Sequence, residues 1–133
     1  MRLYLDPSAL VKRYVAEAES DVVRRTMGEA EAWFMCRVGY VETVRAVGLT
    51  GGNSAVRAFR EEWPGFGVVA VDQDLVESAA GLAVARELRS LDALHLAAAL
   101  LLEDEELVMA TWDGRLHSAA QEEGLRVIPE RLP

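Results

Sequence analysis

The sequence has few residues of the kinds that form disulfides, zinc sites or membrane spans. It contains one cysteine, Cys36, and two histidines among 133 residues, so an internal disulfide is excluded and a Cys/His zinc site is not credible. The longest apolar run, Leu96 to Leu102, is far shorter than the roughly 20 residues of a membrane span, and Asp6 interrupts the N-terminal segment before a signal-peptide core develops. We therefore expect a soluble, cytoplasmic protein with no membrane partner, in which any metal site uses oxygen ligands.

The chain also lacks the signs of more than one domain. No Gly/Ser-rich, Pro-rich or repeated block interrupts it, and its hydrophobic fraction of 51% supplies the material for one core. We expect residues 1–133 to form a single domain.

Positive charge is scarce, because 22 acids face 14 Lys and Arg and give a net charge of −8. Most nucleic-acid binders have the opposite balance. Acids gathered around a metal ion are neutralised by it, which reduces the excess that a nucleic-acid substrate would meet. Composition alone does not indicate RNA.

Apolar strands alternate with helical stretches along the chain. The expected strands are 2–6, 32–36, 67–71, 107–111 and 125–128, and the expected helices are 7–15, 20–28, 38–49, 53–63, 73–88, 91–103 and 116–123. Ser20 and Ser90 are expected as helix caps, and Gly51-Gly52 as a break between two helices. This order predicts an α/β fold, a three-layer α/β/α sandwich around a mostly parallel sheet.

Two acids lie at or just after the ends of predicted strands, at the sheet edge where such folds bind ligands. Asp6 is the last residue of the first predicted strand, and Asp113 comes two residues after the predicted strand 107–111. Each has a structural alternative: Asp6-Pro7 is a good helix start, and Trp112-Asp113-Gly114 is a typical turn. Neither acid indicates function by itself.

Two further acids interrupt apolar helix faces. Glu42 lies in a stripe with Val38, Ala46 and Leu49, and its alternative role is an ion pair with Arg45 or simple exposure. Asp92 lies in the first turn of the most apolar helix, where the helix dipole favours an acid in any case. In the same helix we expect His95 to be an interior or interface residue and assign it no chemistry.

Taken together, Asp6, Glu42, Asp92 and Asp113 predict a metal site. Two acids at strand ends and two on apolar helices can meet at one end of a parallel sheet, and clustered carboxylates need a cation to remain ionised together. Oxygen-only ligation selects Mg²⁺ or Mn²⁺, which suit phosphodiester hydrolysis.

Four segments, in this order and spacing, resemble the PIN-domain family, in particular the VapC toxins of toxin-antitoxin pairs. They are Leu5-Asp6-Pro7-Ser8-Ala9-Leu10-Val11-Lys12, Val41-Glu42, Ser90 to Ala99, and Thr111-Trp112-Asp113-Gly114-Arg115-Leu116. The likeness covers essentially the whole chain, and its Glu42 segment is the shortest. It implies an Mg²⁺- or Mn²⁺-dependent endoribonuclease in which the four acids are catalytic metal ligands supported by the hydroxyls of Ser8 and Thr111.

The resemblance also implies partners: an RNA substrate, a VapB-like antitoxin that inserts a basic residue among the acids, and a second copy of the chain in a homodimer. Lys12, Arg13, Arg45 and Arg89 lie near the acids in the sequence and are candidates for RNA phosphate contacts. Exposed Lys and Arg on helices are more often merely solvated. Trp33 and Trp63 are candidates for a dimer surface, although core packing is the commoner role for tryptophan.

Two other functions agree with parts of the sequence. A non-catalytic module that binds a basic partner peptide in an acidic groove would explain the net charge, although it would not require all four acids. A phosphotransfer receiver-like domain would use Asp72 as its phosphorylated residue, but it also needs a lysine late in the chain, and the only lysine is Lys12. We therefore disfavour the receiver.

Overall fold

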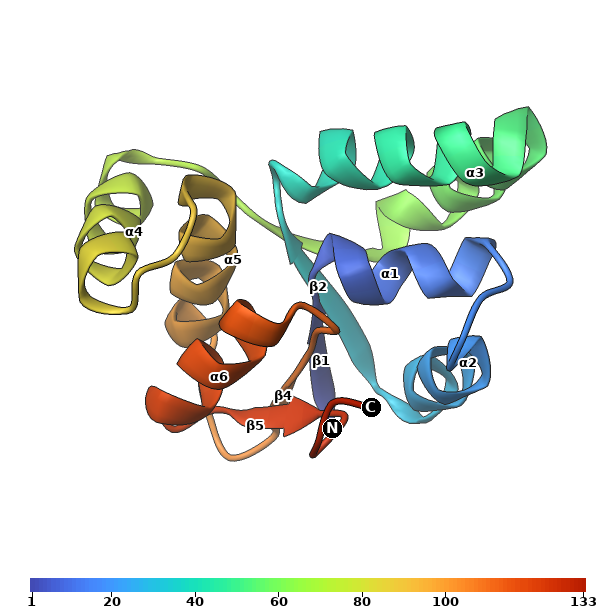
Figure 1. Ribbon diagram of the computed structural model, residues 1–133. Helices are drawn as coiled ribbons and strands as arrows, with labels where there is room; N and C mark the ends of the chain where they lie inside the picture. The colour runs from blue at the N-terminus through green and yellow to red at the C-terminus, as the bar shows by residue number, and fades with distance from the viewer.

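The computed structural model describes residues 1–133, which form a five-stranded sheet with helices on both faces (Figure 1). The strands are β1 (Arg2–Leu5), β2 (Ala32–Cys36), β3 (Gly67–Val69), β4 (Leu107–Ala110) and β5 (Arg126–Ile128). The helices are α1 (Pro7–Tyr14), α2 (Ser20–Glu29), α3 (Gly39–Glu62), the 3-10 turn η1 (Trp63–Gly65), α4 (Gln73–Ala85), α5 (Ser90–Leu101) and α6 (Gly114–Glu122). The predicted α/β/α sandwich is confirmed.

All strand pairs are parallel, in the order β3-β2-β1-β4-β5. Along the chain, β2 and β3 are added outward on one side of β1, and β4 and β5 are then added outward on the other side. The turning point, at which the direction of strand addition reverses, lies between β1 and β4, whose last residues Leu5 and Ala110 are paired. At such a point the neighbouring crossovers leave toward opposite faces of the sheet and open a crevice beyond the strand ends. The fold thus places Asp6 and the Thr111-Trp112-Asp113 segment at this turning point.

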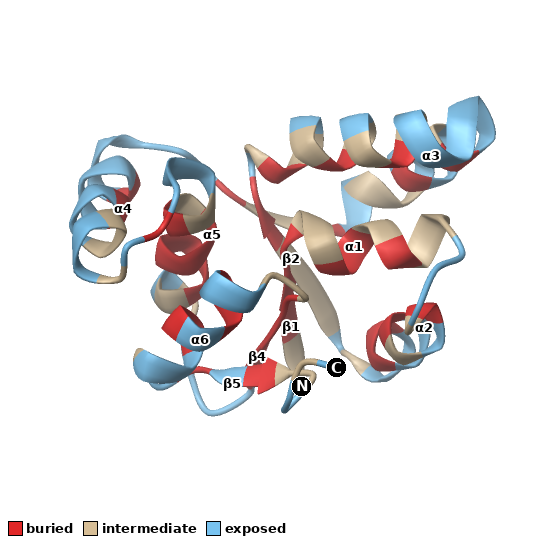
Figure 2. Ribbon diagram, in the orientation of Figure 1, coloured by how far each residue is buried: buried red, intermediate tan, exposed pale blue.

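Two apolar clusters hold the layers together, one on each face of the sheet. One includes Leu10 of α1, Val23 of α2 and Phe59 of α3. The other includes Leu96 of α5 and Leu116 of α6, with α4 packed outside α5. Figure 2 shows the consequence: burial is concentrated in the strands and the inward sides of the helices, and the outer side of α4 is exposed. No helix combines the length and apolarity that crossing a membrane requires.

Several predicted boundaries were wrong, each for a local reason. Ser20 and Ser90 are first helical residues instead of caps; Glu19 and Arg89 occupy the cap positions without a side-chain cap bond. The hydroxyl of Ser20 donates instead to the Val15 carbonyl. The predicted break at Gly51-Gly52, in contrast, is confirmed: α3 consists of two helical stretches joined at a kink at Gly52, whose φ of 72° lies in the left-handed region that glycine adopts without a steric penalty.

Three other elements end or begin at residues that differ from the predicted ones. β3 ends at Val69 because its partner β2 ends at Cys36, which pairs with Val69, so the sequence 70–71 has no strand beside it. α4 ends at Ala85, and Glu87 follows with φ at 53°. α6 begins earlier than predicted, at Gly114, because the Asp113 side chain caps it.

Trp33 and Trp63 are half-buried and lie in one aromatic group. The Trp33 ring packs on Phe66 with centroids 5.4 Å apart, and Trp63 packs on Tyr40 and Phe59 at 5.2 and 5.5 Å. Both tryptophans contact the core cluster beneath α3. Core packing accounts for them.

Candidate functional site

Asp6 is a buried carboxylate at the end of β1, with 2% of its surface exposed. Its Oδ1 accepts hydrogen bonds from the Ala9 backbone N–H (3.0 Å) and the Ser8 hydroxyl (2.7 Å), and its Oδ2 accepts one from the Thr111 hydroxyl (2.6 Å). Burial raises the pKa of Asp6 above 3.8, and the bonds from Ser8 and Thr111 act in the opposite direction. Asp6 is therefore a helix cap, as the structural alternative expects, and also a desolvated charge that a cap does not require.

Asp113 reaches the same place from β4. Its Oδ1 accepts from the Leu116 backbone N–H (2.9 Å) and caps α6, while its own N–H donates to the Thr111 hydroxyl (3.1 Å). One hydroxyl, that of Thr111, thus connects the backbone of Asp113 to the carboxylate of Asp6. The Ser8 hydroxyl adds a second link, because it accepts from the Trp112 N–H at 2.9 Å.

Asp92 faces Asp113 across a shared arginine. The Arg89 Nε lies 3.7 Å from Asp92 Oδ2, and its Nη2 lies 3.8 Å from Asp113 Oδ2. Burial raises the pKa of Asp92 above 3.8, and the negative charge of Asp113 raises it further. The Arg89 side chain is 81% exposed, so this counter-charge is weakly held and screened by water.

Glu42 joins the group through the helix that carries Asp92. Its Oε1 lies 2.7 Å from the Nε2 of His95, which is one turn after Asp92 in α5. The Glu42 charge also contributes to the raised pKa of Asp92. No ion pair forms between Glu42 and Arg45, which is exposed. His95 itself is fully buried, in agreement with the expectation of an interior histidine.

The four predicted acids are therefore linked, each to another through one intermediate side chain or helix turn, at the turning point of the sheet. As the side chains stand, no three His, Cys, Asp or Glu are arranged to hold a metal ion. The reason is visible in the bonds: Asp6 directs both oxygens at hydroxyls, Glu42 contacts His95, and Arg89 lies against Asp92 and Asp113. A cation would have to compete with these contacts, so the assignment of metal ligands stays a prediction.

The basic residues that sequence proximity suggested fall into two groups. Lys12 is buried and donates to the Ala18 carbonyl (2.8 Å) and to Glu17 (3.2 Å), and Arg13 makes a two-bond contact with Glu62 at 2.8 Å each. These two serve the packing of α1. Arg45 and Arg89 are exposed: Arg45 forms no ion pair, whereas Arg89 lies 3.7 and 3.8 Å from Asp92 and Asp113.

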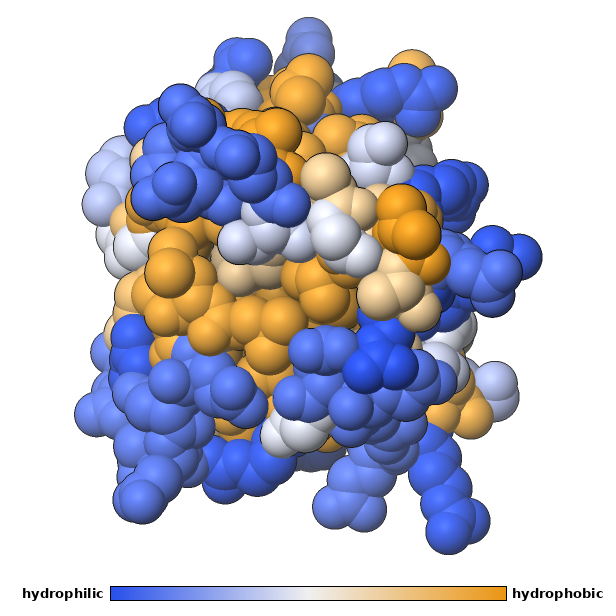
Figure 3. Space-filling view, turned by 90° about the vertical axis from the view of Figure 1, so that its left-hand side faces the viewer, coloured by the Kyte–Doolittle hydropathy of each residue, from blue (hydrophilic) through white to orange (hydrophobic).

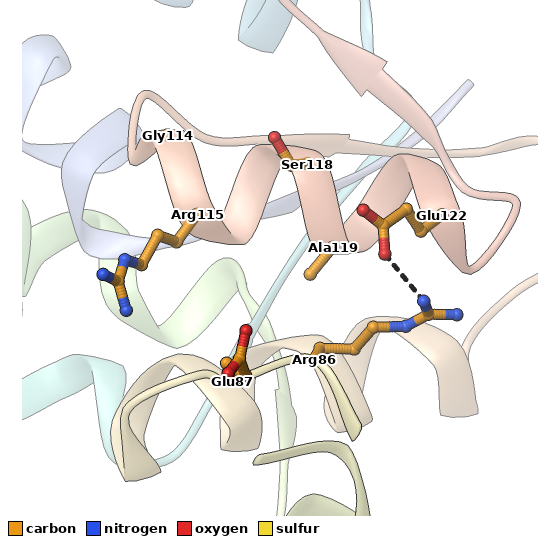
Figure 4. Close-up of a pocket in the computed structure, with 7 residues that line it drawn as sticks. All are labelled: Arg86, Glu87, Gly114, Arg115, Ser118, Ala119 and Glu122. Atoms are coloured by element: carbon orange, nitrogen blue, oxygen red, sulfur yellow. Dashed lines mark hydrogen bonds and ion pairs between the residues drawn. The ribbon is translucent and has the colours of Figure 1, made fainter. Parts of the chain in front are cut away.

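A hollow of about 440 Å³ runs along α6 from Gly114, the residue after Asp113, to Glu122 (Figure 4). Arg115 and Ser118 of α6 line one side, and Arg86 and Glu87 lie across from them. Arg86 is held by Glu122 and Glu123, both at 2.6 Å, whereas Arg115 forms no ion pair. Arg115 was not among the predicted contacts, although it stands two residues after Asp113 within a segment that carried the resemblance.

The site contains four carboxylates and only one nearby guanidinium, that of the exposed Arg89. Its donors match hard divalent cations. Burial is the main cause of the raised pKa of both Asp6 and Asp92, and the neighbouring charges of Asp113 and Glu42 raise the pKa of Asp92 further.

Comparison with known proteins gives sequence matches over nearly the whole chain. The sequence model of the PIN domain family matches residues 3–122. The chain is 37% identical to ribonuclease VapC46 of Mycobacterium tuberculosis H37Rv over 126 residues, covering 95% of each protein. It is 33% identical to ribonuclease VapC45 of the CDC 1551 strain over 139 residues, covering 98% of this chain and 96% of that one.

Solved structures agree at the level of the fold. The crystal structure of Mycobacterium tuberculosis VapC20, a toxin that cleaves the sarcin-ricin loop, superposes with a TM-score of 0.75 at 19% identity, over 98% of this chain and 99% of that one. A toxin-antitoxin complex from Klebsiella pneumoniae has a TM-score of 0.73 at 16% identity, over 98% and 99%.

Proposed function

This chain belongs to the PIN domain family, and from that premise we propose that it is an endoribonuclease, the toxin of a toxin-antitoxin pair. The observation that carries the proposal is the meeting of Asp6, Glu42, Asp92 and Asp113 at the turning point of the sheet. Relatives at 33 and 37% identity over nearly their whole length bear the name ribonuclease. The chain retains every acid that the resemblance requires.

We propose that Mg²⁺ or Mn²⁺ is the cofactor, held by these four acids. The carboxylate donors and the raised pKa values of Asp6 and Asp92 support a hard cation there. A bound ion would supply Lewis-acid chemistry, activating water and stabilising charge on the phosphate.

The residues of the chain then have distinct tasks. Asp92 and Asp113 would hold the cation in place of Arg89, which would then be available to an RNA phosphate. Ser8 and Thr111 hold the Asp6 carboxylate in one orientation through hydrogen bonds of 2.7 and 2.6 Å. The buried floor around Asp6 excludes water from one side of the scissile bond, which strengthens the electrostatic contacts made there.

Metal dependence provides the direct test. Purified protein is expected to cleave single-stranded and structured RNA with Mg²⁺ or Mn²⁺, to stop in EDTA, and to recover when excess metal is restored. Because a contaminating nuclease can also need metal, the Asp92→Asn variant, purified identically, is the control. Equal cleavage by the two proteins, or cleavage in EDTA, would contradict the proposal.

RNA longer than one phosphodiester must continue past the acids, and we propose that it passes over the hollow beside α6. Arg115 is its unpaired cation. In an Asp92→Asn background, which binds without cutting, Arg115→Ala is expected to weaken single-stranded RNA binding and to reduce the slope of log Kd against log salt by about 0.7, the effect of one lost phosphate contact.

The matched control for this prediction is Arg25→Ala on α2, another exposed arginine without an ion pair. It should leave the slope unchanged. Equal slopes for the Arg115→Ala and parent proteins would remove the hollow from the RNA path.

We propose two protein partners. An antitoxin would insert a basic side chain between the acids, and the position of Arg89, 3.7 and 3.8 Å from two of them, supports a guanidinium there. A second copy would cover the apolar band shown in Figure 3, where a hollow of about 470 Å³ between α4 and α5 is lined by residues such as Leu82 and Leu101. Leu101 is 70% exposed, and sedimentation of the purified chain tests the dimer.

A further inference from the structure

A chain of buried hydrogen bonds leads from the backbone of β2 to the carboxylate of Glu42. The Cys36 N–H donates to the Tyr4 hydroxyl oxygen (2.9 Å), that oxygen lies 2.7 Å from His95 Nδ1, and His95 Nε2 lies 2.7 Å from Glu42 Oε1. Tyr4 and His95 are both fully buried. Neither belongs to the acids or to the hydroxyls assigned to the site.

The donors and acceptors of this chain can be satisfied in only one way. The Cys36 N–H can only donate, so the Tyr4 oxygen accepts there and gives its own proton to His95 Nδ1. His95 then carries its proton on Nε2, which donates to Glu42. Either alternative, a proton on Nδ1 alone or on both ring nitrogens, would leave the Tyr4 proton buried without an acceptor, a costly arrangement. Burial also raises the pKa of Tyr4 well above 10.0, so its hydroxyl keeps the proton.

The backbone brings the two ends of this chain into contact. Gly39, in the first turn of α3, packs closely against β2 and α5: a Cβ there would lie 2.5 Å from Met35 Cγ of β2 and 3.1 Å from His95 Cε1 of α5. Glu42 follows three residues later, on the same side of α3. A larger residue at position 39 would crowd both neighbours, so glycine favours the close approach of α3 to α5 that places the Glu42 carboxylate within reach of His95.

We propose that Tyr4 and His95 are positioning residues that fix the Glu42 carboxylate for metal binding. His95 holds Oε1, and Oε2 accepts no hydrogen bond and is available to a cation. Tyr4 lies on the central strand β1 and accepts a hydrogen bond from the backbone of β2. The hydrogen bonds through Tyr4 and His95 therefore tie the orientation of the Glu42 carboxylate to the centre of the sheet. The inference rests on the proposed function, since it assigns the second layer of contacts of the same site.

Tyr4→Phe is the first test, because it removes the hydroxyl and keeps the buried ring. Mg²⁺ affinity, measured by calorimetry on RNA-free protein, is expected to fall about 10- to 100-fold, the usual effect of losing such a contact. RNA cleavage should show the same shift in its Mg²⁺ midpoint and recover most of its rate at saturating Mg²⁺. Tyr14→Phe, which removes a buried hydroxyl without a hydrogen-bond partner, is the matched control and should leave the midpoint unchanged.

A double-mutant cycle separates positioning from packing. His95→Leu is expected to weaken Mg²⁺ binding in the wild type but not in a Glu42→Gln background, because its effect acts through Glu42. His95→Gln, which can still donate toward Glu42, should restore part of the affinity. In wild type without metal, ¹⁵N shifts of His95 should show the Nε2–H tautomer.

The outcomes separate the two proposals. If wild type binds Mg²⁺ and cuts RNA while folded Tyr4→Phe does so with the same midpoint, or if the losses in the cycle add, the positioning role is overturned and the nuclease stands. If wild type binds no Mg²⁺, the proposed function falls and the positioning role falls with it.

Discussion

Replacing Asp92 with asparagine is expected to lower RNA cleavage more than about 10³-fold, a loss of about 4 kcal/mol of transition-state stabilisation, while making the metal-free protein more stable. Activity falls because the site loses a charged metal ligand. Stability rises because Asp92 is partly desolvated beside Asp113 and Glu42, and its pKa is raised by burial first and by those charges second. The neutral amide has the same shape without the repulsion.

The stability gained by Asp92→Asn should change with pH in a defined direction. Since the pKa of Asp92 is raised above 3.8 in the folded protein, its contribution to stability is fully present below pH 3.8 and is lost as the pH rises through the raised value. The contribution of Asp6 has the same sign. In EDTA, the stability gained by Asp92→Asn should therefore be small at low pH and grow toward neutral pH, as measured by thermal unfolding at a series of pH values.

A matched change tests whether this gain is specific to the site. Asp74 also lies in the first turn of a helix, α4, but is exposed and away from the acids. Asp74→Asn removes a charge that the helix dipole favours, so it should be neutral or destabilising by about 0.3–1 kcal/mol. An Asp92→Asn variant that is less stable than wild type in EDTA, or that cuts RNA at the wild-type rate, would contradict the prediction.

The fold and the placement of Asp6 and Asp113 were predictable because they depend on local pattern. β-branched strands alternating with helices determine a parallel sandwich, and the carboxyl ends of parallel strands lie at one edge whatever the details. Asp6 and Asp113 follow strands directly, so their placement required only that β1 and β4 be neighbours. Thr111 lies two residues before Asp113, which is close enough for sequence to suggest its support of the cluster.

The contacts that depend on long-range packing were not predictable. Glu42 and His95 are 53 residues apart, and nothing near Glu42 in sequence distinguishes a buried partner from the expected Arg45. The buried state of Lys12 depends on the loop that turns back over it and offers the Ala18 carbonyl. Leu49, counted in the apolar stripe of α3, is 73% exposed because the helix extends past the sheet. In each case tertiary packing determined a contact or an exposure that the local sequence did not specify.

Asp6 allows its two roles to be separated by a pair of substitutions, and the second large effect is expected there. Asp6→Asn keeps an oxygen for the Ala9 N–H and the Ser8 hydroxyl, so α1 should remain capped. Asp6→Ala removes that acceptor and should destabilise the protein by about 0.5–2 kcal/mol. Both variants lose the buried charge, and both should lower cleavage more than about 10³-fold, the loss expected for Asp92→Asn.

The two variants distinguish the two roles, because a helix cap and a metal ligand predict different combinations of stability and cleavage for asparagine and alanine at position 6. If Asp6 serves only as a cap, asparagine should cleave RNA like wild type and alanine should lose stability alone. If its carboxylate is a ligand, asparagine should be at least as stable as wild type in urea unfolding without metal, because it removes a desolvated charge, yet fail in both Mg²⁺ binding and cleavage. The Thr111 hydroxyl oxygen, which already accepts from the Asp113 N–H, can accept one further hydrogen bond, from an N–H of the new amide. Full cleavage by Asp6→Asn would therefore exclude the carboxylate from the chemistry, whatever the stability of the alanine variant.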